Sequence, residues 1–367
     1  MNTTPLYGAH QRHGAKLVDF AGWSMPLQYS GVIDEYHAVR QQAGLFDVSH
    51  MGRLLFSGEG ALDFLQWVTT NDVAKLSERQ AQYSMVCNLE GGIKDDVFVY
   101  RTGSDAYLLC VNASNREKIS QWLSVQQVKR PNSFTFEDVS TQMAQLALQG
   151  PLSKTILSEI LKDSSLDELK PRWCLNATVS DGNVLITRTG YTGELGYELY
   201  LPAVRAPELW QRLLEAGTPH GLKPAGLGAR DLLRLDMGYF LYGNDLTEET
   251  TPVEAGAEWV VGFQKPDFIG STVLKKQKQD GPTRRLVAFE LLEKAVPRHD
   301  MAIYAKDERI GQVSSGNLSP ILQMGIGMGY VTPQYASEGT PLDIQVRGKK
   351  VSAVVVKPPF YRRKTSS

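Results

Sequence analysis

Two adjacent carboxylates follow a tight glycine turn near residue 90. Residues 91–96 read GGIKDD and lead directly into the strand-like run 97–100. Because successive side chains of a strand point to opposite faces, at most one of Asp95 and Asp96 can enter a given pocket. A carboxylate placed there could organise a reacting centre, whereas the structural alternative is that both aspartates cap the turn.

A second segment combines flexible backbone, flat rings and acids. Residues 188–198 read RTGYTGELGYE, so three glycines fall within seven residues, beside Tyr191 and Tyr197. Glycines let the backbone approach a ligand closely, tyrosine rings offer stacking surfaces, and Glu194 and Glu198 add carboxylates. The segment is either a ligand-binding loop or a hairpin with a bulge and half-buried tyrosines.

A glycine-rich helix start lies at residues 226–231 (GLGARD). The GxGxxG pattern of dinucleotide sites is not completed, so no such site is predicted. Arg230 stands in the first helical turn, from which it could clamp a carboxylate or an amide edge.

The histidines and cysteines do not indicate a metal centre or a nucleophilic triad. None of the six histidines stands in an HExxH or similar ligand spacing, and there is no GxSxG motif. The three cysteines, Cys87, Cys110 and Cys174, are widely spaced and form no CxxC pair, which favours a reducing compartment.

The composition is that of an ordinary globular chain with room for two or three domains. Of its 367 residues, 42% are hydrophobic and 22% are charged, and 39 basic residues nearly balance 40 acidic ones. This balance favours neither nucleic acid nor an anionic membrane as a partner. The one basic cluster, Arg362, Arg363 and Lys364, could be a solvated tail. The first residues lack an apolar signal region, and no run reaches the roughly 18 apolar residues of a membrane span, so we expect a cytoplasmic protein.

Helical and strand-like segments alternate irregularly over the first 245 residues, which favours an α+β fold. The predicted helices are residues 32–42, ended by Gly44, then 61–68, 207–216 and 229–237, and one that Ser114 and Glu117 begin as a capping box. The predicted strands are residues 53–57, 83–88, 97–101, 107–111, 145–149, 184–189 and 197–201, and the last two pair across a glycine-rich turn.

The pattern changes after about residue 245. Short β-rich segments at residues 285–291, 308–314, 342–346 and 350–356 predict a small barrel-like domain. The polar stretch 275–284 is predicted to be a linker or long loop, and the glycine run 325–329 a turn.

Seven segments, taken together and in order, resemble the aminomethyltransferase (T-protein) family of the glycine cleavage system. They are residues 19–26 (DFAGWSMP), 46–52 (FDVSHMG), 91–96 (GGIKDD), 111–115 (VNASN), 190–194 (GYTGE), 228–235 (GARDLLRL) and 239–245 (YFLYGND). Several motifs in one register are far more specific than any one of them alone.

The resemblance implies an α+β fold with three domains in a cloverleaf around a central folate channel. Domain 1 would be discontinuous, with residues 1–52 plus 139–245. Domain 2 would be residues 53–138, and a β-rich, barrel-like domain 3 would be residues 246–367.

The resemblance also implies a reaction. The methylene carbon of an aminomethyl group on lipoylated H protein would pass to tetrahydrofolate, giving 5,10-methylenetetrahydrofolate, ammonia and dihydrolipoyl H protein. The implied partners are tetrahydrofolate and the H protein, with no metal, nucleic acid or membrane.

Matching positions imply roles for nine residues. Asp96 would be the catalytic carboxylate beside the folate nitrogens N5 and N10, acting by orientation, by electrostatics or as a base. Glu198 would accept hydrogen bonds from the pterin edge, with Arg230 as its basic neighbour. The other implied folate contacts are Met51, Tyr83, Asn112, Tyr191, Tyr239 and Arg362.

A folate-binding member of the same fold family without transferase activity is the alternative. The iron–sulfur-cluster assembly type carries a Lys-Gly-Cys motif, which is missing from this sequence. The demethylase type is fused to a flavin oxidase, for which we expect no room in this chain. The motifs therefore favour the transferase.

Overall fold

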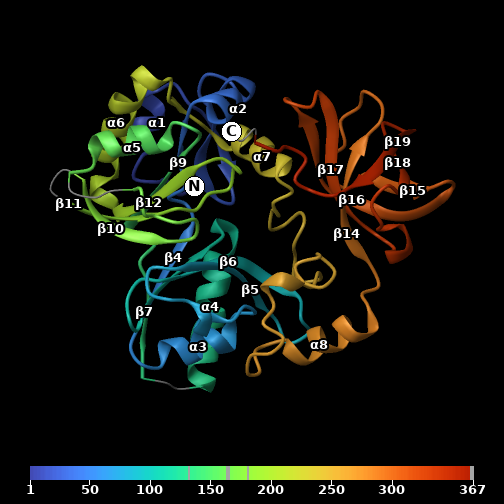
Figure 1. Cartoon of the computed structure of the whole chain (residues 1–367), viewed down its shortest axis with the longest axis horizontal. Coiled ribbons are helices and arrows are strands. Elements are labelled where there is room, and N and C mark those ends of the chain that lie inside the picture. Colours follow the sequence, from blue (N-terminus) through green and yellow to red (C-terminus); the bar gives the residue numbers. More distant parts are fainter. Residues whose placement is uncertain (131–132, 163–165, 180–181, 364–367) are drawn as a thin grey trace. The chain divides into compact units, whose positions relative to one another are not determined.

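The computed structural model describes residues 1–130, 133–162, 166–179 and 182–363 (Figure 1). Lys364 of the predicted basic cluster and a few positions of the predicted domains lie outside the described residues. The chain divides into two compact units. Unit 1 comprises Met1–Gln66, Asp72–Tyr83 and Val97–Asp231, and unit 2 comprises Trp67–Asn71, Ser84–Asp96 and Leu232–Ser367. The three-domain division implied by the resemblance stays a prediction.

A six-stranded sheet forms the centre of unit 1. Its strands, in spatial order, are β10 (Cys174–Val179), β11 (Gly182–Thr187), β12 (Gly196–Pro202), β9 (Met143–Gln149), β3 (Gly44–Asp47) and β13 (Lys223–Pro224). Neighbours are antiparallel except β13, which is parallel to β3. The predicted pairing of the segments 184–189 and 197–201 is present as β11 and β12, with Thr187 opposite Glu198.

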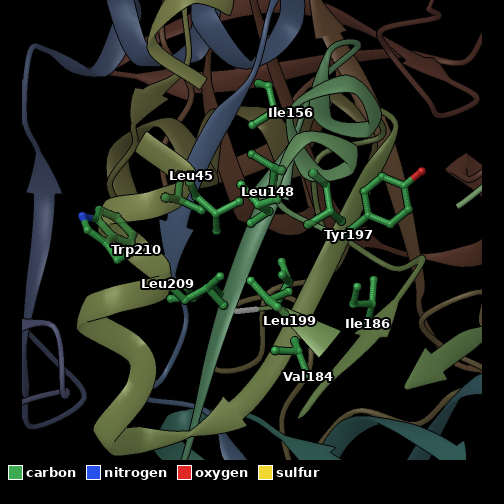
Figure 2. Packing of buried hydrophobic residues seen from close by; sticks show 14 of the residues in the cluster. Leu45, Leu148, Ile156, Val184, Ile186, Tyr197, Leu199, Leu209 and Trp210 are labelled. Atoms are coloured by element: carbon green, nitrogen blue, oxygen red, sulfur yellow. The ribbon is translucent and has the colours of Figure 1, made fainter. Parts of the chain in front are cut away.

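Helices pack their apolar residues against this sheet. They are α1 (Tyr7–Arg12), α2 (Val32–Gln41), α5 (Ser153–Ile160) and α6 (Ala206–Gly217), and the hairpin β1 (Lys16–Phe20) and β2 (Trp23–Gln28) lies between α1 and α2 in the chain. Figure 2 shows Leu209 and Trp210 of α6 gathered with Leu45, Leu148 and Leu199 of β3, β9 and β12. Each such side chain contributes roughly 1.5–3 kcal/mol when fully buried.

A five-stranded sheet has the order β5 (Ala81–Cys87), β6 (Ile93–Arg101), β7 (Ala106–Val111), β4 (Gly52–Ser57) and β8 (Thr135–Asp138). The helices α3 (Ala61–Val68) and α4 (Arg116–Lys129) connect its strands. The first residues of β6, up to Asp96, belong to unit 2. The short 3-10 helices of unit 1 are η1 (Val73–Lys75), η2 (Ala113–Asn115), η3 (Ala203–Arg205) and η4 (Thr218–His220).

Unit 2 contains a closed barrel, as the sequence predicts. Its strands, in spatial order, are β14 (Arg285–Leu291), β17 (Met324–Val331), β16 (Glu308–Ser319), β15 (Ala302–Ala305), β18 (Pro341–Val346) and β19 (Lys349–Val356). Its interior is apolar and includes Phe289, Ile303 and Ile344. The helix α7 (Leu227–Asp236) runs into unit 2, which also holds η5 (Glu258–Val260), α8 (Ser271–Asp280) and η6 (Pro333–Tyr335). The expected α+β class with a β-rich C-terminal barrel is therefore confirmed.

Two expectations about helix ends are wrong. Helix α2 ends at Gln41, and Gly44 opens β3 instead of ending the helix. A Cβ at Gly44 would lie 2.4 Å from the Val39 Cγ2 atom, so this glycine is needed for packing. Ser114 lies within η2, and α4 has Asn115 at its N-cap with no side-chain capping bond, so there is no capping box.

Two expectations about the C-terminal part are also wrong. The stretch 275–284, predicted to be a linker or long loop, continues α8 as far as Asp280. Lysine and glutamine favour helix, and the buried side chain of Leu274 anchors the first turns of α8. The glycine run 325–329 lies within β17, not in a turn. Gly327 stands opposite Phe289 of β14, and a Cβ there would be 2.5 Å from the Phe289 ring, so the glycine leaves space for an aromatic side chain.

Candidate folate and one-carbon site

A buried carboxylate lies at the centre of the unit 1 candidates. Glu198 of β12 accepts hydrogen bonds from the Thr189 hydroxyl and, at 3.5 Å, from the Tyr100 hydroxyl on one oxygen. Its other oxygen accepts from the Gln145 amide at 3.3 Å. These donors come from β6, β9 and the segment after β11. The fold thus surrounds Glu198 with a set of donors that no single segment contains.

The tyrosine hydroxyls around this carboxylate remain protonated. The Tyr200 hydroxyl donates to that of Tyr100 at 3.2 Å. Burial, and then the charge of Glu198, raises the pKa of Tyr100 well above its ordinary value. Burial does the same to the pKa of Tyr200. Both hydroxyls therefore act as donors: that of Tyr200 donates to that of Tyr100, which donates to Glu198.

A cation stacks on an aromatic ring near this network. The Arg230 guanidinium lies 4.6 Å from the centre of the Tyr191 ring, within the range of a cation–π contact. Burial lowers the pKa of Arg230, while Tyr191 and Glu198 act in the opposite direction. The structure thus brings together Tyr191, Glu198 and Arg230, three residues implied by the resemblance.

Met51 and Asn112 flank one end of a strand pair. The antiparallel register of β4 and β7 places Gly52 opposite Val111, so Met51 and Asn112 stand on either side just beyond these strands. Met51 packs against the cluster that includes Tyr100 and Cys110. Its carbonyl accepts from buried Arg53 at 2.5 Å, which ties the loop to the sheet.

Tyr83 joins this group through aromatic contacts. Its ring centre lies 5.5 Å from that of Phe98, which lies 5.9 Å from that of Tyr100. Six of the nine implied residues therefore belong to unit 1 and connect to one polar and aromatic cluster: Met51, Tyr83, Asn112, Tyr191, Glu198 and Arg230.

The other three residues, Asp96, Tyr239 and Arg362, belong to unit 2. Asp96 lies half-buried within β6, and Asp95 before it is fully buried. Both aspartates lie inside the strand, and the Gly92 amide in the turn before them donates to the Asn88 side chain at 2.8 Å. As expected from strand alternation, the two carboxylates have different surroundings.

Tyr239 and Arg362 are brought together by the end of α7. The Tyr239 amide donates to the Arg234 carbonyl at 3.0 Å, and the Asp236 carbonyl accepts from the amides of Phe360 and Tyr361 at 2.9 and 3.0 Å. The segment that carries Arg362 therefore runs beside the residues that precede Tyr239. Both side chains are exposed.

Several residues around the candidates were not predicted from the sequence. Tyr100 could have been found, because it lies on the same face of a strand as Phe98 and Asp96. Thr189 lies within the quoted segment 188–198. Gln145 gives no local signal, since only the pairing of β9 with β12 brings it to Glu198.

His50, in the quoted segment 46–52, is a buried neutral base. Burial lowers its pKa to about 3. Its Nδ1 atom has no hydrogen-bond partner among the described residues, and its ring meets that of Phe20 edge-on at 5.6 Å. The imidazole is therefore held uncharged by its surroundings.

The remaining features do not point to another site. Within the described ranges there is no group of three or more His, Cys, Asp or Glu side chains placed to hold a metal, and no helix there could cross a membrane. A cavity of about 660 Å³ in unit 1 borders Met1 and Trp23. Of its charged groups, Arg116 and Asp138 already pair at 3.0 Å, and the cavity includes none of the nine implied residues.

The chain matches two protein-family models. These are the GCVT N-terminal domain over residues 6–265 and the glycine cleavage T-protein C-terminal barrel domain over residues 284–362. The second match covers the strands of the barrel. Together they span most of the described chain.

Full-length relatives agree with these matches. An aminomethyltransferase of Halothermothrix orenii is 50% identical over 98% of this chain and 100% of its own length. One from Desulfitobacterium hafniense is 44% identical over 99% of each. The crystal structure of the glycine cleavage system aminomethyltransferase T from Bartonella henselae superposes with a TM-score of 0.92, at 34% identity, over 99% of this chain and 98% of that one. The chain therefore belongs to the glycine cleavage T-protein family of aminomethyltransferases.

Proposed function

We propose that this chain passes the methylene carbon of an aminomethyl group, carried on lipoylated H protein, to tetrahydrofolate. The products are 5,10-methylenetetrahydrofolate, ammonia and dihydrolipoyl H protein. The carbon exchanges its bonds to sulfur and nitrogen on the carrier for bonds to N5 and N10 of the folate. The two protons released from N5 and N10 balance those gained by the thiol and by ammonia. No metal takes part, and the proposed location is the cytoplasm.

The buried carboxylate of Glu198 is the observation that carries this proposal. A carboxylate offers about four acceptor positions, and Thr189, Tyr100 and Gln145 occupy three of them. The oxygen that bonds to Gln145 keeps room for one more donor. A pterin edge presents adjacent N–H donors, and its flat ring suits the stack of Arg230 on Tyr191. We therefore assign tetrahydrofolate recognition to these residues, with Met51, Tyr83, Asn112, Tyr239 and Arg362 as further contacts.

We assign catalysis to Asp96. The carbon develops positive charge as ammonia leaves, and a nearby carboxylate stabilises that charge and orients the folate amine. Its half-buried place in β6 fits this role, because a carboxylate held by a strand has little freedom to turn away. Orientation and electrostatics would then account for most of its effect.

The test compares wild type with Asp96→Asn and with Asp105→Asn, whose carboxylate is exposed. Production of methylenetetrahydrofolate is followed with tetrahydrofolate and aminomethyl-loaded H protein. We expect Asp96→Asn to retain folate affinity and to lose roughly a hundredfold or more in turnover. Asp105→Asn should match wild type.

Two results would change the assignment. Full turnover by Asp96→Asn would remove Asp96 from catalysis. Folate binding without turnover in the wild type would instead favour the folate-binding alternative.

A further inference from the structure

A short segment of unit 2, residues 242–250, packs against the start of β6, and we call it the brace. The Tyr242 hydroxyl donates to the Ile93 carbonyl at 3.0 Å. The Ile93 amide donates to the Thr250 carbonyl at 2.9 Å. Both backbone polar groups of the first β6 residue are therefore bound by the two ends of the brace.

Two neighbours of Ile93 also contact the brace. The Lys94 ammonium pairs with Glu248 at 2.8 Å. A Cβ at Gly92 would lie 1.9 Å from the Glu248 carbonyl oxygen, so glycine alone allows this close approach. The Asn88 amide, which caps the preceding turn, donates to the same carbonyl at 3.3 Å. The brace therefore restrains the chain from residue 92 to residue 94, where β6 begins.

The brace is itself fixed by a buried acid. Asp245 accepts from Arg234 at 2.9 Å, from the Leu241 amide at 2.8 Å, and from the hydroxyls of Ser314 and Ser315 at 2.5 and 2.9 Å. Four donors from three segments leave this carboxylate little freedom. Movement of the brace would break these bonds, so it provides a rigid support for the strand.

The Tyr242 hydroxyl is suited to this contact. Burial, followed by the charges of Asp95, Glu248 and Asp96, raises the pKa of Tyr242 far above its ordinary value. The hydroxyl therefore stays protonated at neutral pH and donates to the Ile93 carbonyl. Asp96 follows Ile93 by three residues on the same strand, so the direction of its carboxylate depends on how this strand begins.

We infer that Tyr242 is a positioning residue for the one-carbon transfer, acting through Asp96 by fixing the first residue of β6. The inference rests on the proposed function, because it gives Tyr242 an effect only if the Asp96 carboxylate takes part in turnover.

A double-mutant cycle between Tyr242→Phe and Asp96→Asn tests this inference on the full chain, with turnover measured in single-turnover assays so that low rates are resolved. Tyr242→Phe removes one hydroxyl and keeps the ring. We expect kcat to fall about tenfold, the effect of one good hydrogen bond, with the KM for tetrahydrofolate within about twofold of wild type. In the Asp96→Asn background the same substitution should lower kcat by less than about twofold.

The matched control is Tyr335→Phe, which removes a hydroxyl that donates to Glu308 at 3.3 Å beside the barrel. It should leave kcat unchanged in both backgrounds. Equal losses from Tyr242→Phe in both backgrounds would show a general structural defect and overturn the inference, as would no loss at all. High turnover by Asp96→Asn alone would remove Asp96 from catalysis and overturn the inference with it, whereas only a wild type without turnover would reject the proposed function.

A second variant keeps the test decisive if Tyr242→Phe does not fold. Glu248→Gln removes the ion pair to Lys94 at the same end of β6 while keeping the side-chain size. The inference requires that Glu248→Gln lowers kcat by less than Tyr242→Phe does, and that this loss again disappears in the Asp96→Asn background. A loss that persists there would contradict it.

Discussion

At the scale of single residues, the candidate site depends on a carboxylate that is buried yet satisfied. Removing a carboxylate from water is costly unless hydrogen bonds replace the lost hydration. Glu198 regains them from Thr189, Tyr100 and Gln145, all neutral donors. Among the residues that the structure describes, no cation pairs directly with it at short range, so its charge remains available to N–H donors of a ligand.

Glu198→Gln should therefore weaken folate binding more than it slows turnover. The amide keeps the size of the side chain but halves its acceptor capacity and turns an NH₂ group toward existing donors. Hydrogen bonds to a charged group contribute about 1.5–3 kcal/mol, so we expect a loss of roughly 10- to 100-fold in tetrahydrofolate affinity, measured by equilibrium titration. The control Glu137→Gln, an exposed change on β8, should bind as wild type does. Equal affinity of Glu198→Gln and wild type would remove Glu198 from the site.

At the scale of elements, apolar spacing predicts which segments form helices and strands better than it predicts the residues at which they end. The helix α3 was predicted with the correct bounds, because Leu62, Leu65 and Val68 recur at helical spacing. Strand β14 was also correct. Ends failed where tertiary packing decides, as at Gly44, whose place in β3 follows from its contact with Val39.

The site itself was predictable only in part. Motifs pointed to Glu198, Tyr191 and Arg230, but nothing local links Gln145 to Glu198, since strand pairing alone brings them together. Likewise Tyr242 lies in a quoted motif, yet its contact with Ile93 joins segments about 150 residues apart. Such contacts depend on topology, which a single sequence shows only indirectly.

The glycines of β17 give a prediction at this scale. Gly327→Ala should destabilise the barrel, because its Cβ would lie 2.5 Å from the Phe289 ring and 2.8 Å from the Ser315 carbonyl oxygen. Overpacking of this kind typically costs about 1–3 kcal/mol, which urea unfolding measures. The control Gly103→Ala meets nothing closer than the Ala106 Cβ at 3.4 Å. If both variants unfold at the same urea concentration, the close packing of Phe289 over Gly327 is not needed for stability.

At the scale of the whole molecule, buried titrating groups make the stability of the fold depend on pH. Burial raises the pKa of Asp47, but its bonds to His10, Thr4 and Ser49 outweigh this and leave that pKa below its ordinary value. Asp47 thus stabilises the fold above the pKa of the unfolded carboxyl, about 3.9, and this contribution is lost as the pH falls through the folded pKa. Buried His50 also makes the fold less stable in acid, but over a pH range closer to neutrality.

The sign for His50 follows from its lowered pKa. Burial sets the folded pKa at about 3, against 6.5 for the free side chain. Between these values the unfolded chain binds a proton that the folded chain does not, so stability falls as the pH drops below 6.5. Each pH unit in this range corresponds to about 1.4 kcal/mol.

His50→Gln should remove this dependence because glutamine does not titrate. The free energy of unfolding of the wild type should fall between pH 6.5 and pH 5 by about 2 kcal/mol more than that of the variant, in urea titrations at each pH. The absolute stability of the variant decides nothing here, since a new amide in a buried position has its own cost at every pH. Only the change with pH of the difference in free energy of unfolding between wild type and variant measures the protonation of the imidazole. A difference that stays constant from pH 6.5 to pH 5 would mean that His50 gains a proton in the folded protein as readily as in the unfolded chain, and that its ring is not held neutral beside Phe20 and Arg230.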